Sequence, residues 1–537
     1  MKIAYVQMKI AAGHPDVNTE KILRFIDEAQ TGGADVVIFP ERAISGKLVG
    51  NNISEQSFVQ DCKFFGEKII AASKDIYVVF DDVYNPEENL TGVYYRIAYN
   101  GEQIDEIDLP LRMDFEYEDC YKFLGHFEPC VRFLTKPFSL DRNFSNEKIN
   151  RSTIHVGAVG IQNTGKTIYT FDGGSAVFNS RGEVVQIAEP FAECLNFIDL
   201  EEIDKMPALK LPEISEAEKI YRAISYGVET FLEQIGMKKV VIGVSGGIDS
   251  AVAAALYTKI LGAENVYLVN MPSKFNSATT KNLSEQLAKN LGCRYFVVPI
   301  QESVDWTVKQ LEERGIEVSS FVKENIQARD RSSRILAAIA ASVGGVFTCN
   351  ANKAESTVGY ATRYGDAAGF LSALADLWKY QVYDLARYMN EKIYKREVIP
   401  QGIIDIVPSA ELSTAQNVDE GKGDPLKYPY HDYLFRAFAE NNQTPEDILK
   451  WYAAGELEKN IGCAEGLVEK YFPTAQEFIS DLERWWKQFC GMGVAKRIQT
   501  PPLLAVTDSP YGARQESQNG VYFTQKYLEL KDKLLAR

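Results

Sequence analysis

The stretch Val240-Val241-Ile242-Gly243-Val244-Ser245-Gly246-Gly247-Ile248-Asp249-Ser250 decides the fold of this chain. It is an apolar run, typical of a buried strand, that enters a Ser/Gly turn and continues into a helix predicted from Ala251 to Leu261. Glycines let a backbone approach an anion closely, and the free N–H groups at a helix start carry partial positive charge. The stretch therefore predicts a pyrophosphate-binding turn.

Three side chains of this turn refine the prediction. Ser245 and Ser250 add hydroxyl donors, whereas Asp249 adds a carboxylate that would repel phosphate. A hard cation such as Mg²⁺ between the two negative groups resolves the conflict, which favours ATP with a metal. The turn lacks the Gly-Lys-Ser/Thr ending of the Walker loop, so we expect pyrophosphate release rather than γ-phosphoryl transfer. The alternative is a strand-to-helix turn that binds nothing.

The composition narrows the class of protein. The chain has 537 residues, 45% of them hydrophobic and 25% charged, which predicts a soluble globular protein of two or three domains. Its net charge of −16 disfavours a nucleic-acid-binding surface. No run is long and apolar enough for a membrane span, and no secretion signal precedes the first strand pattern. The eight cysteines form no CxxC pair, so we expect a reducing compartment, the cytoplasm, and no structural zinc.

The pattern of apolar runs predicts two α/β domains. Residues 1–204 alternate short apolar runs with helix patterns, residues 205–214 contain two prolines among charges and predict a linker, and residues 215–537 form a second domain. The buried strands predicted in the second domain are Lys239 to Val244, Val266 to Asn270, Arg294 to Pro299 and Val346 to Asn350. Parallel strands covered by helices bind ligands at their carboxyl ends, where the Ser/Gly turn lies.

Further motifs follow the turn, and together they resemble the NAD⁺ synthase family. They are Asn325-Ile326-Gln327-Ala328-Arg329, Asn352-Lys353-Ala354-Glu355, Gly359-Tyr360-Ala361-Thr362, Tyr364-Gly365-Asp366 and Pro408-Ser409-Ala410-Glu411-Leu412. The turn alone would fit any N-type ATP pyrophosphatase, so the later motifs decide. The resemblance covers roughly residues 215 to 515 and implies a doubly wound parallel sheet of the adenine nucleotide alpha hydrolase type.

The resemblance implies a reaction in two steps. The nicotinate carboxylate of deamido-NAD attacks the α-phosphate of ATP, and ammonia then displaces AMP from the acyl adenylate. Both steps concentrate negative charge, so the chemistry needs Mg²⁺ and protein cations more than a protein nucleophile. Members of this family commonly form homo-oligomers. The rival from another class is a non-catalytic nucleotide sensor.

The resemblance also implies site residues. Asp249 and Lys379 would be catalytic, and Asp249 with Glu355 would bind the metal. Contacts with ATP would come from Gly243, Ser245, Gly246, Gly247, Ile248, Asp249, Ser250, Asn350, Lys379 and Ser409, and contacts with deamido-NAD from Asn325, Glu355, Asp376 and Lys496. Asn350 departs from the family, where a threonine is frequent. The alternatives for single residues are a helix cap for Asn325 and surface charges for the lysines.

Residues 1–204 resemble the nitrilase-like amidase domain that supplies ammonia from glutamine in long NAD⁺ synthases. The segments that carry this resemblance are Val36-Val37-Ile38-Phe39-Pro40-Glu41, Leu109-Pro110 and Phe171-Asp172-Gly173-Gly174-Ser175. They imply a shortened α/β sandwich. In that family a Glu, a Lys and a Cys form the amidase site. Glu41 matches the Glu, but Glu106 occupies the Lys position and reverses the charge.

The amidase nucleophile is the other missing part. The family has a strand that ends in Cys-Glu-Asp between Leu109-Pro110 and Phe171, and we expect no counterpart here. Cys120 and Cys130 lie in this interval, but neither follows a predicted buried strand, so inert thiols are expected. We expect a degenerate glutaminase site, ammonia taken from solution, and a role in assembly or regulation for this domain. The alternative is a glutamine-hydrolysing NAD⁺ synthase with a rearranged amidase site.

Overall fold

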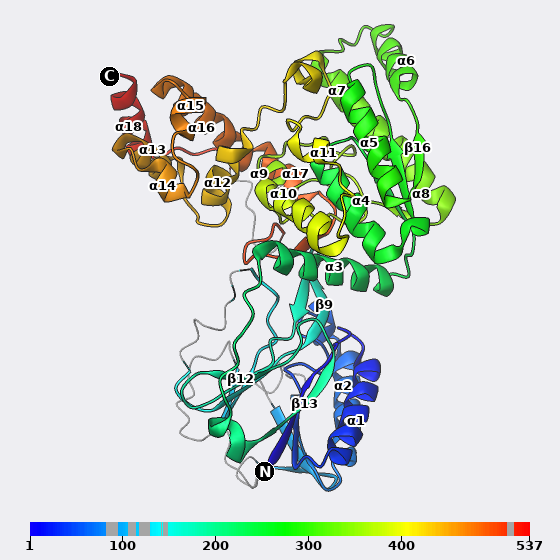
Figure 1. Cartoon of the computed structure of the whole chain (residues 1–537), viewed down its shortest axis with the longest axis vertical. Helices are drawn as coiled ribbons and strands as arrows, with labels where there is room; N and C mark the ends of the chain where they lie inside the picture. Colours follow the sequence, from blue (N-terminus) through cyan, green and yellow to red (C-terminus); the bar gives the residue numbers. More distant parts are fainter. Residues whose placement is uncertain are drawn as a thin grey trace. The chain divides into compact units, whose positions relative to one another are not determined.

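The computed structural model describes residues 1–81, 95–105, 114–117, 129–140, 142, 149–512 and 520–536. The chain divides into two compact units, residues 1–164 with 168–214 and residues 165–167 with 215–537 (Figure 1). Each unit combines helices with a β-sheet, which confirms the predicted α/β class.

Two sheets form most of the described part of the first unit, and β9 and β10 pair with each other in a further sheet. The six-stranded sheet has the order β13-β1-β2-β3-β4-β5, in which β1, β2 and β3 are parallel. The five-stranded sheet has the order β12-β11-β8-β7-β6, in which β6, β7 and β8 are parallel. The bounds are β1 (Lys2–Gln7), β2 (Val36–Ile38), β3 (Tyr77–Asp81), β4 (Tyr95–Tyr99), β5 (Glu102–Ile104), β6 (Asp114–Tyr117), β7 (Cys130–Phe133), β8 (Thr153–Val156), β9 (Val159–Thr164), β10 (Thr167–Asp172), β11 (Ala176–Phe178), β12 (Val184–Ile187) and β13 (Cys194–Asp199).

The first sheet is buried on both faces. Side chains alternate along a strand, so Ile3 and Tyr5 of β1 face the second sheet, whereas Ala4 and Val6 face α1 (Pro15–Thr31) and α2 (Gln56–Ala72). This double burial explains the continuous apolar run at the start of the chain.

The second unit is built on a parallel four-stranded sheet of order β16-β15-β14-β17. Its strands are β14 (Val240–Gly243), β15 (Val266–Asn270), β16 (Arg294–Val297) and β17 (Val346–Phe347), each within a predicted run. The chain leaves β14 in one direction to β15 and β16, and then returns to the other side of β14 as β17. The carboxyl ends of β14 and β17 therefore form a topological switch point, where α/β sheets bind ligands.

Helices surround this sheet, and those near the C-terminus form a group of their own (Figure 1). The apolar pattern from Asn325 to Val343 predicts one regular helix. The structure has α7 (Ser320–Arg329), a π-helical segment (Asp330–Leu336) and α8 (Ala337–Val343) in this region. The other elements are α3 (Glu216–Gln234), α4 (Ile248–Leu261), α5 (Ala278–Leu291), α6 (Gln301–Glu312), α9 (Lys353–Val358), α10 (Lys379–Tyr388), α11 (Gln401–Asp405), α12 (Tyr428–Ala439), α13 (Pro445–Ala454), α14 (Leu457–Ile461), α15 (Leu467–Tyr471), α16 (Ala475–Cys490), α17 (Met492–Ile498), β18 (Leu503–Ala505) and α18 (Gln525–Leu535).

None of the helices in the described part of the chain is both long enough and apolar enough to cross a bilayer.

Candidate active site

A cavity of about 270 Å³ opens at the carboxyl ends of β14 and β17. Its lining contains every predicted ATP contact, from the turn after β14, the segment after β17, the start of α10 and the loop around Ser409, together with Glu355. The structure thus brings together residues that are up to 166 positions apart, since Gly243 and Ser409 face the same space. Their roles in binding stay predictions.

Hydrogen bonds within the turn set its shape. Ser250 Oγ donates to the Gly247 carbonyl at 3.0 Å and accepts from the Ser245 N–H at 3.3 Å, while Ser245 Oγ accepts from the Gly247 N–H at 3.2 Å. The helix α4 begins at Ile248, earlier than predicted, so its first free N–H groups face the cavity. The two hydroxyls therefore hold the loop that would cradle an anion.

Gly246 is required by the geometry of this turn. Its φ is +87°, and a Cβ at this position would lie 2.4 Å from the Thr280 carbonyl oxygen. We expect Gly246→Ala to lower the free energy of unfolding by about 1–3 kcal/mol and to weaken ATP binding by about tenfold or more, or 1.4 kcal/mol. Chemical denaturation and calorimetric titration with ATP measure the two effects.

The neighbouring glycine provides the matched control. Gly247 has a φ of −93°, and a Cβ there would meet only the Ser245 Oγ at 3.3 Å. The free energy of unfolding of Gly247→Ala should therefore lie within about 0.5 kcal/mol of that of the original chain. Equal stability of the two variants would show that the turn does not depend on the left-handed conformation of Gly246.

A charged cluster lies on the floor of the cavity. The Lys379 Nζ is 2.5 Å from Asp249 Oδ2 and 3.6 Å from Glu355 Oε1, and only 4% of the Lys379 side chain is exposed. Asn352 caps α9 through a capping box with Glu355, and its Nδ2 donates to Asp249 Oδ1 at 3.1 Å. Asp249 and Glu355 therefore face one ammonium group from two different helices.

Burial and charge shift the protonation of this cluster. Burial raises the pKa of Glu355, and the nearby Asp249 raises it further, against the effect of Lys379. Burial alone would lower the pKa of Lys379, but the two carboxylates outweigh it and raise that pKa. The cluster thus holds a charged lysine and a glutamate that binds its proton more tightly than usual.

The donor set fits the magnesium ion that the sequence predicts. Mg²⁺ is typically bound by one or two carboxylates together with substrate phosphates and water. Asp249 and Glu355 supply two carboxylates that converge on one point, which Lys379 Nζ contacts in this structure. Among the described residues, no group of three or more His, Cys, Asp and Glu side chains is arranged as a metal site, so phosphate oxygens would have to complete the coordination.

The cavity also contains residues that the sequence did not reveal. Arg331, in the π-helical segment, donates from Nε to the Met271 carbonyl at 3.0 Å, and burial lowers its pKa to about 10. Asp424 Oδ1 accepts from the Tyr360 hydroxyl at 3.0 Å, and burial raises its pKa. The only signal for Arg331 in the sequence is its position, two residues beyond the motif from Asn325 to Arg329.

Three of the residues predicted to contact deamido-NAD do not line this cavity. Asn325 Nδ2 donates to the Phe321 carbonyl within α7, and Asn325 is not a helix cap. Lys496 Nζ donates to the carbonyls of Gly359 and Ala361 at 2.8 and 2.6 Å. The carboxylate of Asp376 is 1% exposed and already accepts from the backbone N–H groups of Val506 and Thr507.

The contacts of the Asp376 carboxylate in this structure are thus made inside the protein, with Lys353, Val506 and Thr507, and its contact with substrate stays a prediction.

In the first unit, Glu41 follows β2 and is 6% exposed. Its Oε2 lies 3.1 Å from Lys47 Nζ, and its backbone carbonyl accepts from the Thr135 hydroxyl at 3.1 Å. Glu106, predicted to replace the amidase lysine, and Cys120 lie outside the described residues. Cys130 is buried at the first residue of β7, the end of the strand opposite to an amidase nucleophile. Lys47 thus places a cation beside Glu41 that the sequence did not reveal.

The strand β6 lies in the interval where the family has its nucleophile strand, and it ends at Tyr117. No Cys-Glu-Asp sequence occurs between Leu109-Pro110 and Phe171, so the expectation that the nucleophile has no counterpart stays a prediction. The strand was missed because it is only four residues long and mixes acidic with aromatic residues.

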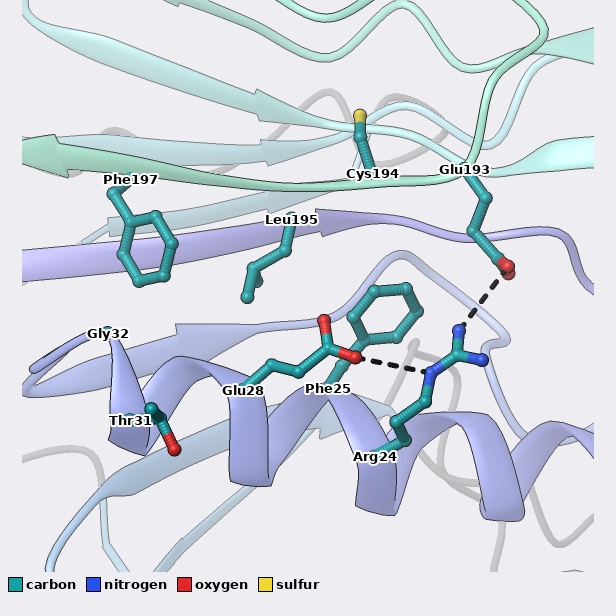
Figure 2. A pocket seen from close by; sticks show the side chains of 9 residues that line it. All are labelled: Arg24, Phe25, Glu28, Thr31, Gly32, Glu193, Cys194, Leu195 and Phe197. Carbon is teal, nitrogen blue, oxygen red and sulfur yellow. Dashed lines mark hydrogen bonds and ion pairs between the residues drawn. The ribbon is translucent and has the colours of Figure 1, made fainter.

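A second cavity, of about 600 Å³, lies between α1 and β13 in the first unit (Figure 2). Arg24 on α1 pairs with Glu28 and Glu193, each at 3.5 Å, so the charges in the groove largely neutralise one another. Leu195 and Phe197 form the rest of its wall. The two carboxylates of this groove are both paired with Arg24, and no phosphate-binding turn lines it, so we place the chemistry in the smaller cavity.

Comparisons with known proteins agree with this placement. Residues 220–461 match the family model of NAD synthase. A glutamine-dependent NAD(+) synthetase from Xylella fastidiosa (strain Temecula1 / ATCC 700964) is 28% identical over 505 residues, 85% of this chain and 92% of that protein. One from Synechocystis sp. is 31% identical and covers 71% of this chain and 64% of that protein.

Solved structures show the same fold. A crystal structure of a glutamine-dependent NAD(+) synthetase from Cytophaga hutchinsonii has a TM-score of 0.77 and 15% identity, and it covers 99% of both chains. The structure of the Acinetobacter baumannii enzyme in complex with adenosine diphosphate has a TM-score of 0.66 and 23% identity, and it covers 86% of this chain and 92% of that chain.

Proposed function

We propose that this chain makes NAD⁺ from deamido-NAD, ATP and a donor of the amide nitrogen. The proposal starts from the membership of the chain in the NAD synthase family, with a nitrilase-like first unit. The observation that carries the proposal is the convergence of the phosphate-binding turn with Asp249, Glu355 and Lys379 in one cavity. ATP would bind with its phosphates over the turn, and Lys379 would leave the carboxylates to contact them as a point charge. Bound Mg²⁺ would neutralise the phosphates and stabilise the leaving pyrophosphate.

The residues of the chain then act mainly by position and charge. The backbone N–H groups of the turn and Lys379 would stabilise the charge that develops at the α-phosphate as the nicotinate carboxylate attacks it. Glu355 lines the cavity with 17% of its side chain exposed, so bound substrates would displace the water beside it and protect the acyl adenylate from hydrolysis before the nitrogen nucleophile arrives.

The test is product analysis with purified protein. With ATP, Mg²⁺, deamido-NAD and ammonium, we expect AMP, pyrophosphate and NAD⁺ in equal amounts, and no AMP without deamido-NAD. Binding of ATP without AMP formation would instead identify a nucleotide sensor.

We propose further that the nitrogen donor is free ammonia. Support comes from the absence of a Cys-Glu-Asp sequence between Leu109-Pro110 and Phe171, and from Glu106 where the resemblance places the lysine. The second candidate is glutamine hydrolysis by a rearranged site. It is favoured by the Lys47 cation beside Glu41 and by the relatives, which are named glutamine-dependent. We also propose that the chain forms a homo-oligomer.

A further inference from the structure

The helix α12 carries a stripe of polar side chains at four-residue spacing, Tyr428, Asp432, Arg436 and, directly after the helix, Glu440. Residues four apart share one face of a helix. Asp432 is 1% exposed and Tyr428 is 6% exposed, so α12 buries an acid and a phenol beside its apolar residues. Because burial of an uncompensated carboxylate is unfavourable, the contacts of this stripe need an explanation.

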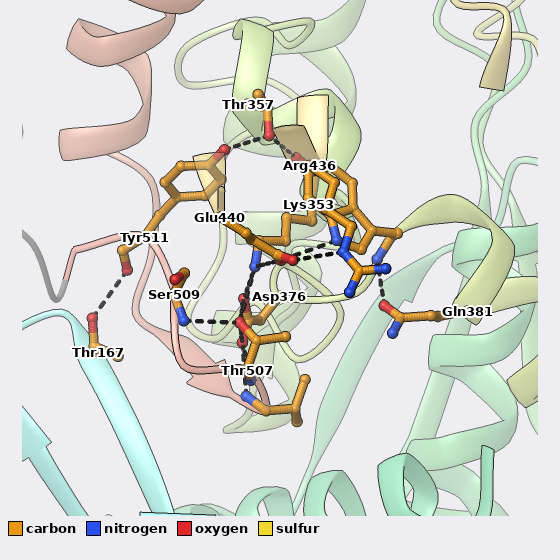
Figure 3. A network of polar contacts seen from close by, with 12 residues as sticks. Thr167, Lys353, Thr357, Asp376, Gln381, Arg436, Glu440, Thr507, Ser509 and Tyr511 are labelled. Carbon is orange, nitrogen blue, oxygen red and sulfur yellow. Dashed lines mark hydrogen bonds and ion pairs between the residues drawn. The ribbon is translucent and has the colours of Figure 1, made fainter. Parts of the chain in front are cut away.

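Glu440 connects the stripe to the segments that carry Glu355 and Lys379. Its Oε1 accepts from Lys353 Nζ at 2.7 Å and from Trp378 Nε1 at 3.0 Å (Figure 3). Lys353 is fully buried and also contacts Asp376 Oδ1 at 2.7 Å. Lys353 lies two residues before Glu355, and Trp378 immediately precedes Lys379. One carboxylate therefore holds the start of both α9 and α10.

Asp432 and Tyr428 make the second connection. Asp432 Oδ2 accepts from the backbone N–H of Tyr380, in the first turn of α10, at 3.0 Å. The Tyr428 hydroxyl donates to Glu355 Oε1 at 3.2 Å, and its ring centroid lies 4.8 Å from Lys379 Nζ. Both neighbours of Lys379 are thus bound to α12 or to the residue directly after it, Trp378 through its indole N–H and Tyr380 through its backbone N–H.

We infer that Asp432 and Glu440 are positioning residues for the ATP-facing groups Lys379 and Glu355, so that α12, outside the nucleotide-binding sheet, sets the geometry of the phosphate site. This inference rests on the proposed function. With both flanks of Lys379 fixed, only its side chain has to move from the carboxylates to the phosphates, and a small displacement of the backbone would misplace the ammonium group.

The experiment compares paired variants of the full chain with MgATP as the ligand. We expect Glu440→Ala and Asp432→Ala to raise the KM for ATP by about tenfold and to lower kcat, while the KM for deamido-NAD changes less. Glu440→Gln should recover most of the loss, because its amide oxygen still accepts from Lys353 and Trp378. If an alanine variant does not fold, Asp432→Asn and Glu440→Gln are measured, with smaller increases in the same direction expected.

Asp481→Ala is the matched control. Asp481 Oδ2 lies 2.8 Å from His431 Nε2 of α12, and Asp481 Oδ1 accepts from Trp485 Nε1 at 3.2 Å. Its removal therefore disturbs the packing of the same helix, and these hydrogen bonds do not go to α9 or α10. We expect it to lower the Tm and leave the KM for ATP unchanged. A lowered Tm with an unchanged KM for ATP in the Asp432 and Glu440 variants as well would overturn the inference.

Direct titration of each variant with MgATP separates this inference from the proposed function. If the original chain forms no NAD⁺ but binds MgATP, and Glu440→Ala binds it about tenfold more weakly, the reaction is wrong and the positioning role stands. If the original chain forms NAD⁺ and Glu440→Ala binds MgATP equally well, the positioning role is wrong.

Discussion

Ammonium is expected to support NAD⁺ formation by this chain, whereas glutamine should give no more than about one-hundredth of that rate. No Cys-Glu-Asp sequence occurs between Leu109-Pro110 and Phe171, so we expect no thiolate placed to attack the glutamine amide. Glu106, in the place of the amidase lysine, would repel an oxyanion rather than stabilise it. The measurement is NAD⁺ formation with each donor, with contaminating ammonium removed from the glutamine enzymatically.

Two cysteine variants serve as controls for this prediction. Cys120→Ala and Cys130→Ala should leave the rates with both donors unchanged, because neither thiol is expected to act as a nucleophile. Robust turnover with glutamine, with one glutamate released per NAD⁺, would contradict the prediction and support the rearranged site. In that case, Lys47 would belong to the rearranged site if Lys47→Met lowered the rate with glutamine and left the rate with ammonium unchanged.

Replacement of Asp249 by asparagine should lower kcat/KM for ATP by about a hundredfold to a thousandfold. Asparagine keeps the shape of the side chain and can still accept from Lys379, so the fold should persist. It removes one of the two carboxylates that converge where the metal is predicted to bind. We expect the dependence of the rate on Mg²⁺ concentration to shift to much higher concentrations.

The control for charge alone is Asp384→Asn. Asp384 lies on α10, the helix that begins with Lys379, but its side chain is 57% exposed and pairs with Arg387. This variant should retain the original rate and Mg²⁺ dependence. An Asp249→Asn chain that kept its full rate at ordinary Mg²⁺ concentrations would remove Asp249 from the metal site.

Features that lie close together in the sequence could be predicted. The turn from Ser245 to Ser250 is one contiguous segment, and β14 and β15 are buried on both faces, so their apolar runs are unbroken. The strand β6 lacks such a pattern, because its four residues are too few to give a recognisable apolar run. The helix from 325 to 343 was predicted as regular, since a π-helical turn leaves no mark in periodicity.

The parts of the site that come from distant segments could not be predicted. Asp424 and Arg331 enter the cavity from a loop and from a π-helical segment, and no spacing in a single sequence indicates that they meet. Family resemblance assigned a substrate contact to Asp376, but resemblance carries no information on burial. Only the fold shows that Val506 and Thr507, 130 and 131 positions later, occupy its oxygens.

The position of Lys379 between Asp249 and Glu355 has a consequence for what the cavity accepts. A free triphosphate would meet two acids, and a free divalent ion would meet an ammonium group, so each alone enters against like charge. When the two arrive as a complex, the ion can bind the two acids while the phosphates bind the lysine. Each charged group then replaces one partner of opposite charge with another. We therefore expect the cavity to bind the metal–nucleotide complex more tightly than either of its components alone.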